Sequence, residues 1–307
     1  MNNKKTVLFH RDFAGFTGGH LKVWDYFQHV NSSKIFSSKI FFTANSSWNS
    51  NPWNKVRDNC LEEWNPDHSD ILFLAGMDWL ALSKEQRYSP PSPVINLIQS
   101  VRHADKKLPL YEFLKYPATR ICVSQEVADA INSTGVVNGL VVTNTNGIDL
   151  DLLPEPVEKD IPFLIVGIKN RELASKIASQ LSKKNIQSRV LVERLTRDEY
   201  LSLVARAKVI LLLPYRAEGF YLPALEAMYL RALVICPDCV GNRGFCIDDE
   251  TCFKPDYDEE PIIKSTMQAL LLSYDKRETL LNNAYERAKN STLSKERDQF
   301  LKMLSKI

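Results

Sequence analysis

Residues 218–228 read EGFYLPALEAM, and this stretch indicates the turn between a strand and a helix. The run before it, VILLLP at 209–214, is short, apolar and rich in β-formers, which predicts a buried strand. Pro223 suits the first turn of a helix, where its missing N–H costs nothing. We therefore expect Glu218 in the loop after the strand and Glu226 within about one turn of the helix start.

The turn between the two glutamates is suited to binding a diphosphate. The first N–H groups of a helix have no partner within the helix, and they attract anions. A carboxylate just inside the helix, Glu226, is well placed to accept hydrogen bonds from ribose hydroxyls. Glu218, in the loop, is well placed to meet the sugar beyond the phosphates. The residues expected to line the donor between them are Gly219, Phe220, Tyr221 and Leu222.

The pattern resembles the E-x7-E signature of retaining GT-B glycosyltransferases, especially family 4. As in that family, a strand at 232–236 and a turn reading VGNR at 240–243 follow the motif. Upstream, ICVS at 121–124 and NGID at 146–149 resemble the stretch where the first domain of the family ends. The order of these segments is preserved across most of residues 100–255. An isolated pair of glutamates would instead be explained by an ordinary helix surface.

The resemblance implies cations that face the diphosphate. Family members carry an arginine and a lysine after the first strand of the second domain, and this chain has Lys169 and Arg171 after FLIVG at 163–167. Which of the two contacts phosphate stays open, and the alternative is a solvated helix start. Arg243 is a further cation candidate in a nearby loop. Tyr221 stands where the family has glycine, so it would narrow the approach to the diphosphate or stack on a ligand.

Two further sites come from the first half of the chain. Gly18 and Gly19 follow the first strand and open an amphipathic helix, which resembles the glycine-rich loop of GT-B enzymes that faces the donor phosphates or the acceptor. The alternative is a tight turn, and His20 beside it reads equally well as an exposed residue. His103 is expected to contact the donor sugar, as a histidine does at this place in family 4, unless Arg102 is the residue that faces the cleft.

Strand-like and helical stretches alternate along the chain, which indicates an α/β protein with parallel sheets. The resemblance implies the GT-B architecture, two Rossmann-like domains facing a cleft. We expect an acceptor-side domain at 1–152, a nucleotide-sugar-binding domain at 153–290, and a C-terminal helix at 291–307 that returns to the first domain. Strands are predicted at 6–10, 38–43, 70–75, 93–99, 119–123, 140–143, 161–167, 188–192, 208–213 and 232–236. Helices are predicted at 18–30, 105–116, 124–133, 169–184, 196–206, 222–230, 259–273, 276–289 and 293–306, with an irregular segment at 44–66.

Composition excludes several classes of protein. The 307 residues carry a net charge of only +2, so nothing favours nucleic acid as a partner, and no apolar run reaches the roughly 18 residues of a membrane span. The N-terminus lacks a secretory signal, so we expect a cytoplasmic protein, with peripheral contact at the inner membrane face as a possibility. Four cysteines between 236 and 252 have the chemistry to bind zinc, but we interpret them as small buried apolar residues and expect no metal and no cofactor.

Taken with the motif, the resemblance to family 4 implies a metal-independent, retaining glycosyltransferase. It would move a hexosyl or related group from a nucleotide-sugar to a glycan or a lipid-linked saccharide, as in polysaccharide biosynthesis. One alternative is a non-catalytic nucleotide-sugar-binding partner subunit. Another is a different GT-B enzyme, such as a sugar phosphorylase or a nucleotide-sugar epimerase.

Overall fold

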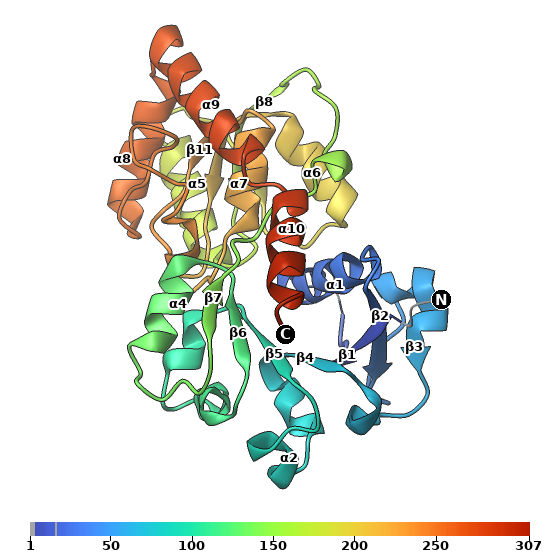
Figure 1. Ribbon diagram of the computed structural model, residues 1–307. Helices are drawn as coiled ribbons and strands as arrows, with labels where there is room; N and C mark the ends of the chain where they lie inside the picture. Colours follow the sequence, from blue (N-terminus) through green and yellow to red (C-terminus); the bar gives the residue numbers. More distant parts are fainter. Residues whose placement is uncertain (1–3, 16) are drawn as a thin grey trace. The chain divides into compact units, whose positions relative to one another are not determined.

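The computed structural model describes residues 4–15 and 17–307, and the chain forms two compact units. The first unit comprises the chain up to Asn146 together with Ser294–Ile307, and the second comprises Gly147–Leu293. Each unit is built on a parallel β-sheet, so the predicted α/β fold class is confirmed (Figure 1). Among the described residues, no helix is long and apolar enough to cross a membrane.

The first unit contains a seven-stranded sheet in the order β3-β2-β1-β4-β5-β6-β7, with every neighbouring pair parallel. Its strands are β1 (Lys5–Arg11), β2 (Phe36–Phe42), β3 (Cys60–Leu61), β4 (Ile71–Ala75), β5 (Val94–Ile98), β6 (Thr119–Cys122) and β7 (Val141–Thr143). Its α-helices are α1 (Gly18–Asn31), α2 (Lys84–Tyr88), α3 (Pro109–Glu112), α4 (Gln125–Asn132) and α10 (Leu293–Leu304). Its 3-10 helices are η1 (Pro52–Asn59), η2 (Pro66–His68), η3 (Gly76–Ala81), η4 (Val101–Ala104) and η5 (Phe113–Lys115).

The second unit contains a four-stranded parallel sheet in the order β11-β10-β8-β9. Its strands are β8 (Ile161–Val166), β9 (Arg189–Leu191), β10 (Ala207–Leu212) and β11 (Leu233–Ile235). Its helices are α5 (Arg171–Ser182), α6 (Arg197–Ala205), α7 (Leu222–Tyr229), α8 (Glu259–Leu270) and α9 (Tyr274–Lys289), with short 3-10 turns η6 (Leu150–Leu152) and η7 (Val240–Asn242).

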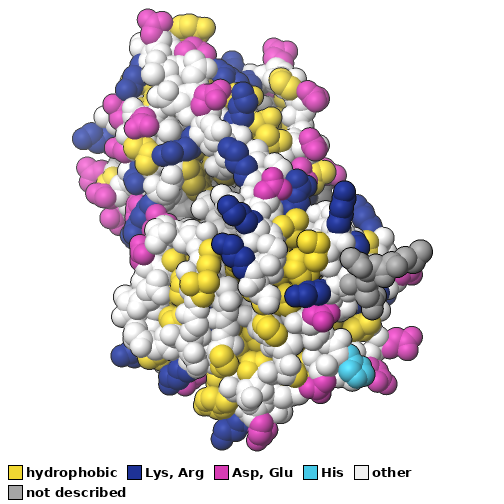
Figure 2. All heavy atoms as spheres, viewed as in Figure 1, with side chains coloured by type: hydrophobic (Ala, Val, Ile, Leu, Met, Phe, Trp, Pro, Cys, Tyr) yellow, Lys and Arg dark blue, Asp and Glu magenta, His cyan; other side chains and the backbone are white. Residues whose placement is uncertain are grey.

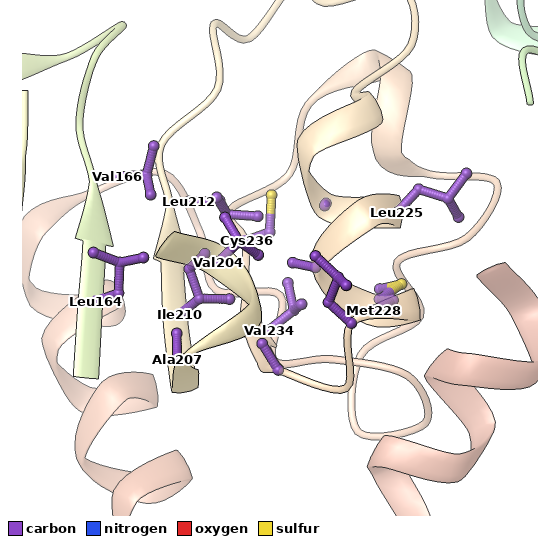
Figure 3. Packing of buried hydrophobic residues seen from close by; sticks show 14 of the residues in the cluster. Leu164, Val166, Val204, Ala207, Ile210, Leu212, Leu225, Met228, Val234 and Cys236 are labelled. Atoms are coloured by element: carbon purple, nitrogen blue, oxygen red, sulfur yellow. The ribbon is translucent and has the colours of Figure 1, made fainter. Parts of the chain in front are cut away.

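Apolar strands buried on both faces explain why these sheets form. All five residues of β4 (ILFLA) and of β5 (VINLI) are buried, which is typical of parallel strands covered on both sides. In the second unit, alternate residues of β8 and β10 point to opposite faces. One set packs with α6 and α7, as Figure 3 shows for Leu164, Ile210, Val204 and Met228. The other set packs with α5 and α8.

Each sheet reverses its strand order at one place. In the first unit the order turns between β1 and β4, and in the second it turns between β8 and β10. At such a switch point, loops leave the carboxyl ends of two adjacent strands in opposite directions, which opens a crevice where ligands bind in α/β proteins. The topology therefore predicts that functional residues lie in the loops that follow these four strands.

The predicted secondary structure is largely confirmed, with one helix wrong. All ten predicted strands are present, and 44–66 is irregular apart from η1 and the two-residue β3. The helix expected at 105–116 is instead split into the α3 and η5 turns, preceded by η4. Pro109 begins α3 and has no N–H, so a helix that enters from residue 105 cannot continue through it. The short α2 and η3 were not predicted.

Within the first unit, α10 packs against α1 through a ring contact and a buried ion pair. The Phe300 ring lies edge-on to Tyr26 with centroids 4.8 Å apart. Glu296 Oε2 accepts a hydrogen bond of 2.7 Å from Lys22 Nζ, which also pairs with Asp25 at 2.7 Å. Burial alone would lower the pKa of Lys22, but the charges of Asp25 and Glu296 outweigh it and raise that pKa.

The surface shown in Figure 2 carries charges of both signs, and the clustered cysteines lie in the core of the second unit. Acidic and basic side chains are interspersed over the face shown in Figure 2, with scattered apolar side chains between them. Cys236, Cys239, Cys246 and Cys252 are buried free thiols in the core of the second unit, where burial raises the pKa of the Cys239 thiol. They pack as small apolar residues.

Candidate functional site

In the second unit, an ion pair spans the switch point between β8 and β10. Lys169 follows β8, Glu218 follows β10, and Lys169 Nζ donates a hydrogen bond to Glu218 Oε1. The Lys169 side chain is one-third exposed and that of Glu218 less so. Both residues were predicted as site residues on separate grounds, and the structure brings them together.

Aromatic rings hold the Lys169 ammonium in place. Its Nζ lies 5.1 Å from the ring centroid of Tyr221 and 5.6 Å from that of Tyr215, distances at which a ring face attracts a cation. Tyr221 is 3% exposed, so its side chain packs inward on the core and presents its face to the lysine. Burial is the main reason why the pKa of the Tyr221 hydroxyl is raised, and nearby ionisable groups add to the effect.

The 240–242 turn packs against the loop that carries Glu218 and is hydrogen-bonded to its backbone. Tyr221 N–H donates to Gly241 O at 2.9 Å, and Val240 N–H donates to Arg216 O at 3.1 Å. A Cβ on Gly241 would lie 2.4 Å from Phe220 N and 2.7 Å from Glu218 O, so only glycine permits this approach. The glycine–asparagine turn that follows the motif in the sequence therefore fixes the backbone of the candidate donor loop.

Glu226 is more deeply buried than Glu218, the other glutamate of the motif. It is 0% exposed on α7, and its Oε1 accepts a hydrogen bond of 2.6 Å from Arg197 Nη2. Its second oxygen, Oε2, is buried without a hydrogen-bond partner among the described residues. The same is true of the hydroxyl of Tyr200, a neighbour whose pKa is raised by burial first and then by the charge of Glu226.

Arg197 is the residue of this site that sequence reasoning missed. It is the first residue of α6, directly after the capping box formed by Thr196 and Glu199. The capping box marks the helix start in the sequence, but nothing in the sequence relates that start to α7, which lies a strand and a loop further on. Its side chain is 34% exposed, whereas the Glu226 side chain that it contacts is fully buried.

The other predicted cations of the second unit lie on its surface. Arg171 is the first residue of α5 and pairs with Glu193 at 3.0 Å, with both side chains more than half exposed. Arg243 pairs with Asp238 at 2.7 Å, also largely exposed. Of the remaining loop residues, Gly219 is buried, while Phe220 and Leu222 are partly exposed. Lys169 is therefore the predicted cation that lies beside a motif carboxylate.

The first unit repeats this arrangement at its own switch point. Arg11 ends β1, Asp78 lies in η3 after β4, and Arg11 Nη1 contacts Asp78 Oδ2 at 2.7 Å. Arg11 Nε also donates to His20 Nδ1 at 3.2 Å. Gly18 and Gly19 form the first turn of α1, capped by the Thr17 hydroxyl, which accepts from His20 N–H.

His103 is buried in the first unit. It lies in η4, and its Nδ1 donates to Ser100 O at 3.0 Å, so the proton sits on Nδ1 when the ring is neutral. Its Nε2 has no partner among the described residues. Burial, together with the charges of Arg120 and Arg102, lowers the pKa of His103 to about 4, which keeps the ring neutral at physiological pH. Arg102 beside it is exposed.

Comparison with known proteins identifies the fold. Residues 150–287 match the sequence model of the family described as "Glycosyl transferases group 1", a segment that lies within the second unit and contains both motif glutamates. A comparison with curated protein sequences gave no match.

Solved structures resemble the chain over nearly its whole length. The structure of HepE from Anabaena in complex with UDP-glucose is 12% identical, with a TM-score of 0.79 over 98% of this chain and 100% of that one. Sucrose-phosphate synthase from Thermosynechococcus elongatus is 11% identical, with a TM-score of 0.76 over 99% of both chains. A glycosyltransferase from Rickettsia africae is 13% identical, with a TM-score of 0.74 over 98% of both chains.

The two comparisons together define the class: the chain has the GT-B fold, and its residues 150–287 match the glycosyl transferases group 1. Its second unit contains the glycosyl transferases group 1 domain.

Proposed function

We propose that the protein is a retaining, family 4-like glycosyltransferase that takes its sugar from a nucleoside diphosphate donor bound by the second unit. The observation that carries this proposal is the contact of Lys169 with Glu218 at the switch point between β8 and β10. A cation and a carboxylate side by side suit the two ends of the bond that breaks: the ammonium meets phosphate oxygens and the carboxylate meets sugar hydroxyls.

The reaction needs no enzyme nucleophile in this scheme. The bond between the anomeric carbon and the diphosphate oxygen breaks, and the acceptor oxygen bonds to the same face of that carbon. The acceptor's proton passes to the departing phosphate oxygen. Negative charge grows on the diphosphate as the bond breaks, so a fixed cation such as Lys169 stabilises the transition state more than the ground state.

Glu226 would accept hydrogen bonds from the ribose hydroxyls of the donor. Its Oε1 is held by Arg197, and Oε2 has no partner among the described residues. Because the whole side chain is 0% exposed, the ribose would reach it only after the partly exposed Arg197 side chain moves aside. Arg197 would then lie beside the nucleotide as a further cation.

The remaining features of the proposal rest on the resemblance. The acceptor would be a glycan or a lipid-linked saccharide, as in polysaccharide biosynthesis. The protein would act in the cytoplasm, either free or in peripheral contact with the inner membrane face. The transfer would need no divalent metal, since the N-terminus of α7 and nearby cations would bind the diphosphate. HepE was solved with UDP-glucose, so uridine diphosphate sugars are the first donors to test.

A two-stage experiment tests the proposal. A panel of nucleotide-sugars is first screened for thermal stabilisation, since a ligand at 100 times its dissociation constant adds about 2.7 kcal/mol. The donor that binds is then incubated with saccharide acceptors in excess EDTA, and the product's anomeric configuration is read by NMR. We expect transfer with retention. Inversion, or loss of transfer in EDTA with rescue by manganese, contradicts the mechanism, and binding without transfer favours the non-catalytic partner subunit.

A further inference from the structure

The first unit carries a cluster of polar side chains at its own switch point that is separate from the predicted donor loop. Arg11 at the end of β1, Asp78 after β4 and His20 on the first turn of α1 form a chain of contacts: Asp78 to Arg11 at 2.7 Å and Arg11 to His20 at 3.2 Å. Three segments of the fold converge here, and ligands of α/β sheets bind at this kind of position.

The contact with Arg11 decides which nitrogen of His20 carries the proton. An arginine side chain only donates hydrogen bonds, so Nδ1 of His20 must accept, and in the neutral ring the hydrogen lies on Nε2. Nε2–H has no hydrogen-bond partner among the described residues, and His20 is only half-buried. The ring therefore offers a single donor, and it has no free basic nitrogen to take up a proton.

The surroundings hold this donor rigidly. Asp78 is 6% exposed, and its Oδ2 accepts both from Arg11 and from Ala75 N–H at 2.9 Å, so Arg11 is anchored to buried backbone. Gln99, which follows β5, donates from Nε2 to Gly19 O at 3.2 Å. The Phe13 ring packs on His20 with centroids 4.8 Å apart. The contacts of Gln99 with Gly19 and of Phe13 with His20 hold the first turn of α1 against the carboxyl edge of the sheet.

Charge indicates what the donor recognises. Of the charges that act on His20, that of Arg11 is the strongest, followed by those of Asp78 and Asp12, and Arg11 is paired with Asp78 at 2.7 Å. Because Asp78 compensates the Arg11 charge, the site recognises its ligand through the Nε2–H hydrogen bond more than through charge, and a neutral hydroxyl is a suitable acceptor.

We propose that His20 donates a hydrogen bond from Nε2–H to a sugar hydroxyl of the substrate, and that Arg11, held by Asp78, is the positioning residue that fixes this tautomer. The inference rests on the proposed function, since it gives the first unit a contact with the same sugar substrates. It assigns His20 to sugar binding and not to general base catalysis.

Imidazole NMR tests the tautomer without any need for activity. In ¹⁵N-labelled protein at neutral pH, we expect the His20 signals of a ring protonated on Nε2, and a mixture of tautomers in Arg11→Met, which removes the donor to Nδ1. Arg11→Lys, which restores a donor, should recover part of the Nε2–H form. A wild-type ring protonated on Nδ1, or an unchanged tautomer in Arg11→Met, overturns the assignment.

Matched histidine variants test the role in binding. His20→Gln keeps a donor near the position of Nε2 and should retain transfer to within about threefold, whereas His20→Ala should lower kcat/KM by roughly 3- to 10-fold, the range for one hydrogen bond. His68→Gln, at an exposed histidine of η2, is the control and should behave as wild type. Equal and complete loss in both His20 variants would point to a base, and normal activity in both would exclude a substrate contact.

A titration with free saccharides separates this inference from the proposed function. The Nε2–H resonance of His20 should shift when a saccharide acceptor or the sugar of the donor is added. If the protein transfers no sugar but the resonance shifts, the proposed function fails and the sugar contact stands. If transfer occurs while the resonance and kcat/KM of His20→Ala stay unchanged, the contact is wrong and the proposed function stands.

Discussion

Lys22 of α1 and Glu296 of α10, 274 positions apart in the sequence, form an ion pair of 2.7 Å that is almost wholly excluded from solvent. Two charges removed from water cost several kcal/mol each, and their mutual attraction offsets this only while both are present. The pair therefore ties α10 to α1, because Glu296 is one of two carboxylates that compensate the buried Lys22 charge and the other, Asp25, belongs to α1 itself.

Removal of one partner of this pair should destabilise the protein strongly. Lys22→Met leaves the Asp25 and Glu296 carboxylates without their shared lysine, and we expect a loss of about 3–5 kcal/mol in the free energy of unfolding. Glu296→Gln leaves Lys22 paired with Asp25 alone, so its loss should be smaller. Lys302→Met, an exposed lysine of the same helix, should change it by less than about 0.5 kcal/mol. The double variant Lys22→Met/Glu296→Leu should recover part of the loss in urea denaturation. If Glu296→Gln matches the control, the pair does not anchor α10.

Glu226→Gln should weaken binding of the nucleoside diphosphate by roughly 1.5–3 kcal/mol, the range for hydrogen bonds to charged groups. The expected reason is loss of an ionised acceptor for the ribose hydroxyls. Calorimetry with the free nucleotide measures it, and Glu199→Gln, an exposed glutamate of α6, serves as the control. Unchanged affinity in Glu226→Gln would contradict the ribose role.

Glu218→Gln and Lys169→Ala should separate the two ends of the donor. Glu218→Gln should lower turnover but leave nucleoside diphosphate affinity nearly intact, the pattern of a contact with the reacting sugar. Lys169→Ala should weaken diphosphate binding and slow transfer as well. Lys176→Ala, an exposed lysine of α5, should do neither. If Lys169→Ala binds and turns over normally, Arg171 and Arg243 become the next candidates for the phosphate cation.

The buried His103 should make stability depend on pH between 6.5 and about 4. Its pKa falls from 6.5 to about 4 on folding, so in this window the unfolded chain binds a proton that the folded one does not. The contribution of His103 to the free energy of unfolding is thus fully present above pH 6.5. It is lost as the pH falls through this window and amounts to at most about 3 kcal/mol. Urea titrations at several pH values should show a smaller slope in His103→Gln and an unchanged slope in His68→Gln. Equal slopes in wild type and His103→Gln would refute the assignment.

Gly241→Ala should disrupt the donor loop. The new Cβ would lie 2.4 Å from Phe220 N, so the 218–222 backbone must move, and we expect a loss of about 1–3 kcal/mol in stability together with weaker nucleotide binding. At Gly244, an added Cβ meets no atom within 4 Å, so Gly244→Ala is a matched control three residues away. Normal thermal stability and affinity in Gly241→Ala would mean that the 240–242 turn does not support the loop.

Local signals in the sequence were sufficient for the elements and for the motif loop. Continuous apolar runs such as those of β4 and β5 identify buried strands, and Pro223 identifies the start of α7, because each depends on neighbouring residues alone. The alternation of strands and helices predicted the α/β class with parallel sheets, and the resemblance to family 4 implied the GT-B fold. The helix predicted at 105–116 is wrong because Pro109 interrupts it.

Contacts between distant segments could not be predicted in this way. Arg197 meets Glu226 because α6 and α7 lie side by side in the fold, and neither residue type at its own position indicates the other. The same holds for Asp78, which lies in a 3-10 turn that the sequence did not reveal, and for its contact with Arg11. Contacts of this kind depend on how distant segments pack together, so the residue types at the two positions do not predict them.

The discontinuity of the first unit has a consequence for how the protein is made. Ser294–Ile307 belongs to that unit, yet a ribosome synthesises it only after all of Gly147–Leu293. At roughly 5–20 residues per second, the second unit alone occupies the ribosome for on the order of ten seconds. Throughout that interval the nascent first unit has Lys22 but not Glu296, so a binding partner for this lysine is missing until the last helix leaves the exit tunnel. The order of synthesis therefore gives the second unit the opportunity to fold first.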